Sequence, residues 1–472
     1  MRKNLLFIFV GFSISLGSYL LISNNGYKKY NIIKSQINKN RTTLKKYLLP
    51  YKLISQQEET ITQQKEIISQ REKTIAKEKQ RLSPFVSLEL AKKKRGDSIK
   101  IKESFTQTSN NKTIKKYKLI DGFYAGIYRD LLYPGSGFID FHKNNIFILS
   151  SRGILAYRRE LTDDKNDFKQ IKNNINSFIG REQFKKNKWF SIKDILIAND
   201  KVFVSYTEEI KSNCWGTSVI YGNLNYQNIE FKRLFSPISC VHAVFNIDET
   251  FNAHQSGGRI ISLDDENILL TIGDYRSRHL SQNLNSVFGK IIKINIKTSQ
   301  YKIVTAGNRN AQGLYFDEEN NFLIQTEHGP FGGDEINLID IEKIYKHKIQ
   351  NYGWPISSGG EHYPSVVEYN PNIYKKYPLH KSHINYGFIE PIKSFTPSIG
   401  ISEVAKIGKN KYVVSSLKDK SLYFITLNSK NELQKIIREE VFERIRDLKY
   451  NNKKLYMFME DTASIGVINL NN

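Results

Sequence analysis

The chain has 472 residues, more than one compact core usually holds and enough for a large domain with extensions. Aromatic residues make up 12% of it, which favours β-strands. Residues 1–120 hold 26 Lys and Arg against 8 Asp and Glu, so +18 of the net charge of +24 lies there and the rest of the chain is only mildly basic. A nucleic-acid-binding protein would carry this excess on its folded domain, so we expect no nucleic-acid partner.

Residues 1–25 are predicted to form a signal anchor, that is, a single transmembrane helix. Arg2 and Lys3 precede an apolar stretch over residues 5–22, whose length fits either a short transmembrane helix or the core of a cleaved signal peptide. No small-x-small cleavage site precedes Asn24, which favours the uncleaved anchor and predicts a single-pass protein of the bacterial inner membrane with its folded domain in the periplasm. The lysines that follow favour the opposite orientation by the positive-inside rule, so charge leaves the orientation open.

Residues 26–96 are predicted to form a helical stalk. An apolar residue recurs every seven positions, at Ile54, Ile61, Ile68, Ile75 and Leu82. The partner positions of the heptad are polar, so the apolar seam is thin. Two interpretations stay open: a weak coiled coil through which the chain self-associates, or a solvated single helix. Residues 97–116 are polar and are interpreted as a linker.

From residue 117 the apolar pattern changes to a period of two. One unit recurs six times, consisting of an apolar strand, a polar turn rich in Asn and Asp, and a second apolar strand. The copies lie at residues 138–151, 194–208, 260–274, 314–328, 403–417 and 447–461. This spacing is typical of propeller blades with loops. We therefore predict an all-β fold, a six-bladed β-propeller over residues 117–472.

Polar residues flank these hairpins at the ends that a propeller brings to one face. In three of the units these positions hold four cations, Arg309, Lys418, Arg444 and Arg446. Cations that converge on one mouth of the central channel would bind a compact polyanion. The alternative is that each cation caps its own loop and pairs with a nearby acid, such as Asp419.

Several motifs resemble the glucose/sorbosone dehydrogenase family. They are GNRNAQG at residues 307–313, TEHGPFGGDEINL at 326–338 and NYGWP at 351–355, with shorter matches at 258–260, 271–274, 416–418 and 444–447. They occur in the family's order and cover roughly residues 190–472. The resemblance implies a six-bladed propeller that binds pyrroloquinoline quinone (PQQ) and Ca²⁺ and oxidises an aldose, a small sugar, at its anomeric carbon.

The resemblance assigns roles to the cations. Lys418, Arg444 and Arg446 would hold the carboxylates of PQQ. Arg309 and Asn310 would contact its quinone side, with Arg309 also taking part in catalysis.

The resemblance also implies two calcium sites. The backbone carbonyls of Gly329 and Pro330 would hold a catalytic Ca²⁺, since this ion prefers oxygen ligands. Glu335 and Tyr352, with Asp334 nearby, resemble a second, structural site. Seven extra residues between Glu335 and Tyr352 depart from the family pattern at that second site.

Catalysis in this family uses a histidine as general base, oriented by an aspartate. His254 and Asp274 are the candidates here. The family places this histidine four residues before an arginine, whereas His254 precedes Arg259 by five. One alignment keeps His254 as the base, and the other puts Gln255 in its position, so both stay open.

A second function class follows from these departures. Residues 186–194 also lack the glutamine that contacts the cofactor in the family's second blade. A propeller that has kept the fold and lost the chemistry would act as an envelope binding module. The retained cations favour the enzyme.

The two cysteines, Cys214 and Cys240, bracket two expected neighbouring strands. We predict that they form a disulfide, which would close a loop worth roughly 3 kcal/mol. Free thiols are the alternative, expected if the domain were cytosolic.

Overall fold

The computed structural model of the chain describes residues 34–36, 38–39, 57–75, 98–119, 127–128, 131–132, 136–151, 153–159, 167–179, 192–248, 251–363 and 371–470. The chain divides into two compact units, Met1–Arg81 and Leu82–Asn472. The predicted anchor over residues 1–25 lies outside the described residues. Among the residues that the structure describes, no helix combines the length and the apolar character that crossing a membrane requires.

In the first unit, residues 57–75 form a helix within the predicted stalk over residues 26–96, and the stalk as a whole stays a prediction. The heptad residues Ile61, Ile68 and Ile75 are each about half exposed within this chain. The choice between a coiled coil and a single helix therefore stays a prediction.

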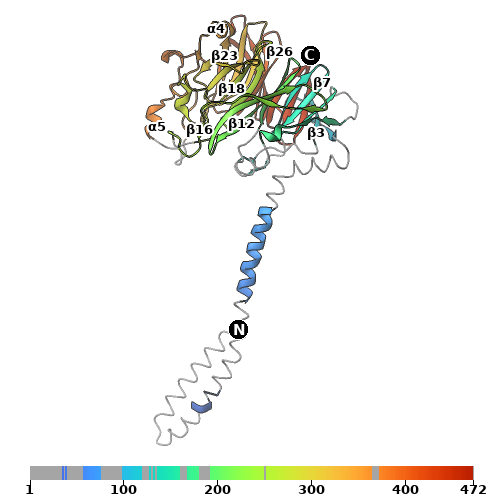
Figure 1. Ribbon diagram of the computed structural model, residues 1–472, viewed down its shortest axis with the longest axis vertical. Coiled ribbons are helices and arrows are strands. Elements are labelled where there is room, and N and C mark those ends of the chain that lie inside the picture. Colours follow the sequence, from blue (N-terminus) through green and yellow to red (C-terminus); the bar gives the residue numbers. More distant parts are fainter. Residues whose placement is uncertain are drawn as a thin grey trace. The chain divides into compact units, whose positions relative to one another are not determined.

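Among the described residues, the second unit contains six sheets of four or five strands, antiparallel except for the pair β20–β24, which we number as blades in chain order (Figure 1). Blade 1 contains β6 (Gly137–His142), β7 (Asn145–Ser150), β8 (Leu155–Arg159) and β9 (Phe168–Gln170), with β1 (Ser98–Ile99) at its outer edge. Blade 2 contains β11 (Ile192–Ala198), β12 (Lys201–Lys211), β13 (Cys214–Asn223), β15 (Lys232–Phe235) and β16 (Val241–His242). Blade 3 contains β17 (Gly257–Ser262), β18 (Asn267–Ile272), β19 (Lys290–Asn295), β20 (Tyr301–Ala306) and β24 (Gln350–Asn351).

The strands of each blade are named from the channel outward, and the remaining three blades have the same arrangement. Blade 4 contains β21 (Ala311–Asp317), β22 (Phe322–Glu327), β23 (Asp334–Asp340) and β25 (Lys393–Phe395). Blade 5 contains β26 (Ile401–Gly408), β27 (Lys411–Ser416), β28 (Ser421–Leu427) and β29 (Leu433–Glu440). Blade 6 contains β30 (Ile445–Asn451), β31 (Lys454–Met459), β32 (Ser464–Asn469), β3 (Thr113–Leu119) and β2 (Ile101–Gln107).

Shorter elements connect these strands. They are the two-stranded pairs β4 (Ile127–Tyr128) with β5 (Leu131–Leu132) and β10 (Lys172–Asn173) with β14 (Asn228–Ile229), the helices α4 (Ile341–Tyr345) and α5 (Pro371–Lys376), and the 3₁₀ turns η1 (Ile175–Ser177), η2 (Arg278–Ser281) and η3 (Ile384–Tyr386).

The innermost strands close into a ring. In the order β6, β11, β17, β21, β26 and β30, each contacts the next, and β30 contacts β6. The six predicted hairpins are the first two strands of the six blades, so the prediction of a six-bladed propeller is confirmed. Alternation along each strand lets one face pack on the next blade.

The predicted linker at residues 97–116 needs correction. Its residues form β1, β2 and the start of β3. Strand β3 pairs antiparallel with β32, from Lys115 opposite Val467 to Lys118 opposite Ser464, so the beginning of the domain supplies the outer strands of the last blade. This pairing closes the propeller. The domain therefore begins near residue 98 rather than at 117.

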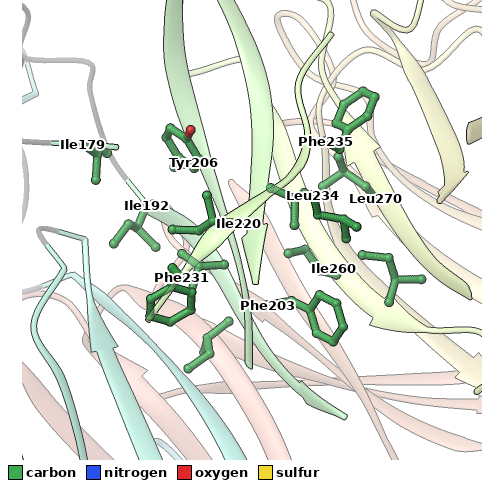
Figure 2. Packing of buried hydrophobic residues seen from close by; sticks show 14 of the residues in the cluster. Ile179, Ile192, Phe203, Tyr206, Ile220, Phe231, Leu234, Phe235, Ile260 and Leu270 are labelled. Carbon is green, nitrogen blue, oxygen red and sulfur yellow. The ribbon is translucent and has the colours of Figure 1, made fainter. Parts of the chain in front are cut away.

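The blades are held together by apolar clusters at their interfaces. Figure 2 shows Phe203 of β12 and Ile220 of β13 packed in one cluster with Ile260 of β17 and Leu270 of β18, and all four side chains are buried. Removing one such aromatic side chain typically costs about 3–5 kcal/mol.

The predicted disulfide is confirmed. Cys214 and Cys240 are bonded, with their Cα atoms 5.3 Å apart. Cys214 begins β13, and Cys240 directly precedes β16, which pairs with β13 at that end. The bond thus fixes the loop that leads from blade 2 toward blade 3.

Candidate active site

One end of the channel is lined by the starts of the innermost strands, and we call this end the mouth. In blades 2 to 6 the ladder between the first two strands shifts register near this end, which marks a β-bulge in each. The extra residues, which we call the bulge residues, are Lys193, Gly258, Gln312, Ser402 and Arg446. Bulges next to functional sites typically re-aim side chains, and here they recur around the mouth.

The residues that follow the bulge residues form a buried ion cluster across the channel. Arg259 is 2.7 Å from Asp194 of blade 2, 2.5 Å from Glu403 of blade 5 and 2.9 Å from Asp447 of blade 6. Burial raises the pKa of Asp194 to about 6 and that of Glu403 to about 8, while Arg259 opposes both shifts. We call these four side chains the Arg259 cluster. It ties blades 2, 3, 5 and 6 together beneath the mouth.

At the mouth itself, Asp274 is fully buried after the second strand of blade 3. Its carboxylate accepts hydrogen bonds from Trp354 Nε1 and from the Arg276 backbone N–H, both at 2.8 Å. In the amide orientation that gives each atom a complementary partner, Gln255 donates to Asp274 Oδ1 at 3.1 Å and accepts from Arg309 Nη2 and Arg276 Nε at 3.0 Å. Burial raises the pKa of Asp274, and Arg309 opposes this rise.

Of the two residues that the sequence left open, Gln255 and not the candidate base His254 lies against Asp274. The bulge at Gly258 stands at the same place as the bulges of blades 2, 4, 5 and 6, so Gly258 is a regular part of the blade. The spacing counted back from Arg259 therefore holds, and the extra residue lies before Gln255. The Tyr275 N–H bonds to the Gln255 carbonyl, which fixes Gln255 beside Asp274, whereas the His254 N–H bonds to Asn252 Oδ1.

Arg309 is also buried at the mouth, as expected. Its Nη1 donates to the His328 carbonyl at 2.9 Å, and its guanidinium carbon lies 5.3 Å from the centre of the Trp354 ring. Asn310 lies next to it, and its side-chain oxygen accepts from Gly257 N and Gln312 Nε2, both at 3.0 Å.

The three cations of blades 5 and 6 differ in their partners. Arg444 and Arg446 share one buried carboxylate, Glu460, at 3.0 and 2.7 Å. Lys418 is exposed, and among the described residues it has no ion pair. Burial is the main cause that lowers the pKa of His328 to about 4, Asp334 opposes the shift, and Arg309, Arg446 and Arg444 add to it. The structure thus places Arg309 and the two blade-6 arginines around His328.

Comparison with known proteins agrees with this arrangement. The sequence profile of the family described as glucose/sorbosone dehydrogenase matches residues 194–468. The chain belongs to the glucose/sorbosone dehydrogenase family. The aldose sugar dehydrogenase of Escherichia coli (strain K12) is 26% identical over 299 residues, 57% of this chain and 74% of that protein. The quinoprotein glucose dehydrogenase B of Acinetobacter calcoaceticus is 35% identical over 136 residues, 22% of this chain and 27% of that protein.

A solved structure shares the fold. The apo form of the soluble aldose sugar dehydrogenase from Escherichia coli matches with a TM-score of 0.53 and 20% identity, covering 78% of this chain and 99% of that one.

For this member of the glucose/sorbosone dehydrogenase family, the loop expected to hold a catalytic calcium is tightly built. Asp334 accepts hydrogen bonds from the N–H groups of Gly329, Gly400 and Ile401 at 3.0, 2.7 and 3.0 Å. The carbonyls of Gly329 and Pro330 receive no backbone hydrogen bond among the residues that the structure describes.

The residues of the expected second calcium site are not brought together through their side chains. Neighbouring residues on a strand point to opposite faces, so Asp334 and Glu335 diverge. Glu335 is buried, 3.6 Å from His383 Nε2, while the Tyr352 hydroxyl donates to the Leu338 carbonyl at 2.7 Å. Over the described residues no group of three or more His, Cys, Asp and Glu side chains is placed to hold a metal ion.

Sequence reasoning missed Lys193, Arg276 and Glu460 at the mouth. Lys193 lay in a segment that departs from the family pattern, and Arg276 lies in the left-handed backbone region of a loop with no strand period. Glu460 directly follows the second strand of blade 6, one position before the equivalent of Asp274 in blade 3, so the repeat itself pointed to this end of the strand.

Proposed function

We propose that this chain is a PQQ-dependent oxidoreductase that oxidises an aldose at its anomeric carbon, with Ca²⁺ at the mouth. Family membership and the named relatives support the reaction class. The observation that carries the proposal is that Arg309, Arg444 and Arg446 lie around His328 at the mouth, where their ion pairs among the described residues are those of Arg444 and Arg446 with Glu460. An excess of cations in a partly buried site fits a compact polyanion.

The residues present fit PQQ, which has three carboxylates. Among the described residues, Arg309 Nε is buried without a hydrogen-bond partner and Lys418 has no ion pair, so both have capacity left. Lys418, Arg444 and Arg446 would hold the carboxylates, with Arg309 and Asn310 on the quinone side. When bound, PQQ supplies a two-electron acceptor for the hydride of the sugar's anomeric carbon.

The chain's own residues must then move the hydroxyl proton of the sugar. Gln255 has no basic nitrogen, so the position beside Asp274 holds no general base. The Asp274 carboxylate is the remaining acceptor of this cluster, and burial raises its pKa. A missing general base costs about 10²–10⁴ in rate, so we expect slow aldose turnover.

Calcium is proposed at one site. The free carbonyls of Gly329 and Pro330 offer the oxygen ligands that this ion takes. A second calcium at Asp334, Glu335 and Tyr352 is not proposed, because the Asp334 carboxylate is already bonded to three backbone N–H groups.

The location of the propeller is also a proposal. The Cys214–Cys240 disulfide supports an oxidising compartment, as does the apolar stretch over residues 5–22. We place the propeller in the periplasm, attached to the inner membrane through residues 1–25, with self-association through the stalk.

A second function is favoured by one observation, Gln255 in the position of the base. A propeller that binds PQQ without oxidising sugars would act as an envelope binding module. Both functions use the same cofactor site, and they differ only in whether the bound PQQ oxidises a sugar.

Titration of the purified full chain with PQQ and Ca²⁺, followed by dye reduction with a panel of aldoses, tests both functions. We expect saturable PQQ binding and slow dye reduction with at least one aldose. Binding without any reduction supports the binding module. Absence of PQQ binding in the presence of Ca²⁺ contradicts the proposed function. Arg446→Gln should weaken PQQ binding, and Arg438→Gln on β29, whose side chain pairs with Asp419 instead, serves as the matched control.

A further inference from the structure

Lys193 is a cation at the mouth that no family motif accounts for. It is the bulge residue of β11 in blade 2, equivalent to Arg446 in blade 6. A side chain at Gly258, the bulge residue of blade 3, would place its Cβ 2.2 Å from Lys193 Cβ and 2.8 Å from its Cγ. Gly258 has a φ of +111° and no side chain, and this leaves the space that the Lys193 stem fills.

Among the described residues, the surroundings of Lys193 are short of negative charge. Glu460 is the carboxylate in its field, and that group is already paired with Arg444 and Arg446. In blade 1, which lies between blades 2 and 6, the described residues at the start of the innermost strand are the uncharged Ser136 and Gly137. Among the described residues Lys193 itself has no ion pair. Three cations therefore face one carboxylate.

An uncompensated cation that is partly buried is costly to a folded protein. Burial is the main cause that lowers the pKa of Lys193 to about 7, Arg446 adds to this lowering, and Glu460 opposes it. An anion at the mouth would supply the missing charge and raise this pKa again.

We propose that Lys193 is an additional cofactor-anchoring residue of this chain, whose ammonium group binds a carboxylate of PQQ from the blade-2 side of the mouth. This inference rests on the proposed function. It gives blade 2 a direct role in cofactor binding at the place where the family's glutamine is missing.

The first test compares the affinity of the full chain for PQQ, in the presence of Ca²⁺, between variants. Lys193→Met keeps the length of the stem and removes the charge, and we expect its Kd for PQQ to rise about 10-fold to 100-fold, as for loss of a charge-assisted contact. Lys193→Arg should stay close to wild type. Lys201→Met, at the turn of the same hairpin, is the matched control and should bind PQQ like wild type.

The second test measures protons, which a purely structural role would not move. Near pH 8 free Lys193 is mostly neutral, so binding should take up about one proton and weaken as the pH rises through 7. Of the groups facing Lys193, Arg446 stays charged, and Glu460 has a lowered pKa and stays ionised. Asp194, the next residue, is paired with Arg259. Calorimetry in buffers of different ionisation enthalpy should show this proton uptake in wild type and its loss in Lys193→Met and Lys193→Arg.

The outcomes separate the two proposals. If wild type binds PQQ and Lys193→Met binds it equally well with the same proton uptake, the role of Lys193 is refuted and the proposed function stands. If wild type does not bind PQQ, both are refuted together.

Discussion

The contacts of Gln255 explain why a glutamine is stable in a place where the family has a base. Its amide donates to a buried carboxylate and accepts from two arginines at once, Arg276 and Arg309. The amide oxygen has two lone pairs and can accept from both arginines while the amide nitrogen donates, whereas a neutral imidazole has one ring N–H and a single acceptor nitrogen. The substitution thus exchanges a proton acceptor for a bridge that holds Asp274 and Arg309 together.

This position gives a gain-of-function prediction. Gln255→His puts an imidazole beside Asp274, which would orient it as a base. We expect the rate of aldose oxidation, measured by dye reduction with PQQ and Ca²⁺, to rise by about 10² or more, with PQQ affinity little changed. His254→Ala is the matched control from the neighbouring residue and should leave the slow wild-type rate unchanged. A large loss in His254→Ala, with no gain in Gln255→His, would reverse the assignment of the two residues.

At the scale of elements, the innermost strands are joined by acids that serve two blades. Asp194 of β11 accepts from Ile260 N on β17 at 2.8 Å, and Asp447 of β30 accepts from Ile139 N on β6 at 2.6 Å. Both carboxylates also pair with Arg259. The bulge residues lie at the starts of the innermost strands, at the mouth. The residues that follow them in blades 2, 3, 5 and 6 point into the channel and form the Arg259 cluster. The mouth and the Arg259 cluster are therefore two consecutive layers built by the same strands.

The Arg259 cluster should be a main determinant of stability. Arg259→Met leaves three buried carboxylates without their shared cation, which typically costs about 3–5 kcal/mol. Urea unfolding followed by tryptophan fluorescence measures this loss. Arg438→Met is the control, because the Arg438–Asp419 pair is largely exposed and should contribute about 1 kcal/mol or less. A loss below about 1 kcal/mol in Arg259→Met would show that the channel is held by apolar packing alone.

At the scale of the whole molecule, the sequence was sufficient for the repeat but not for its closure. Apolar residues alternate along the first two strands of each blade, so all six hairpins were predictable from the period of two and from the Asn and Asp residues of their turns. Strands β2 and β3 were missed because β3 is rich in lysine and its partner β32 lies some 350 positions away in sequence, while β2 pairs only with β3. At the site, motif spacing predicted Arg309, Arg444 and Arg446. The choice between His254 and Gln255 depended on whether Gly258 is an inserted residue or the regular bulge residue of its blade, and sequence spacing alone left that open.

The strand closure leads to a prediction about where the domain can be cut. A fragment of residues 97–472 keeps β1, β2 and β3, whereas one of residues 120–472 loses all three and exposes the edge of β32. Tyr117 and Ile114, both buried on β3, would also leave the core. We expect the longer fragment to unfold in one cooperative thermal transition close to that of the full chain. The shorter one should be insoluble or melt at least about 10 °C lower, since losing two buried side chains and a ladder costs several kcal/mol. Equal melting of both fragments, measured by circular dichroism, would show that blade 6 is stable without the N-terminal strands and would restore a domain start at residue 117.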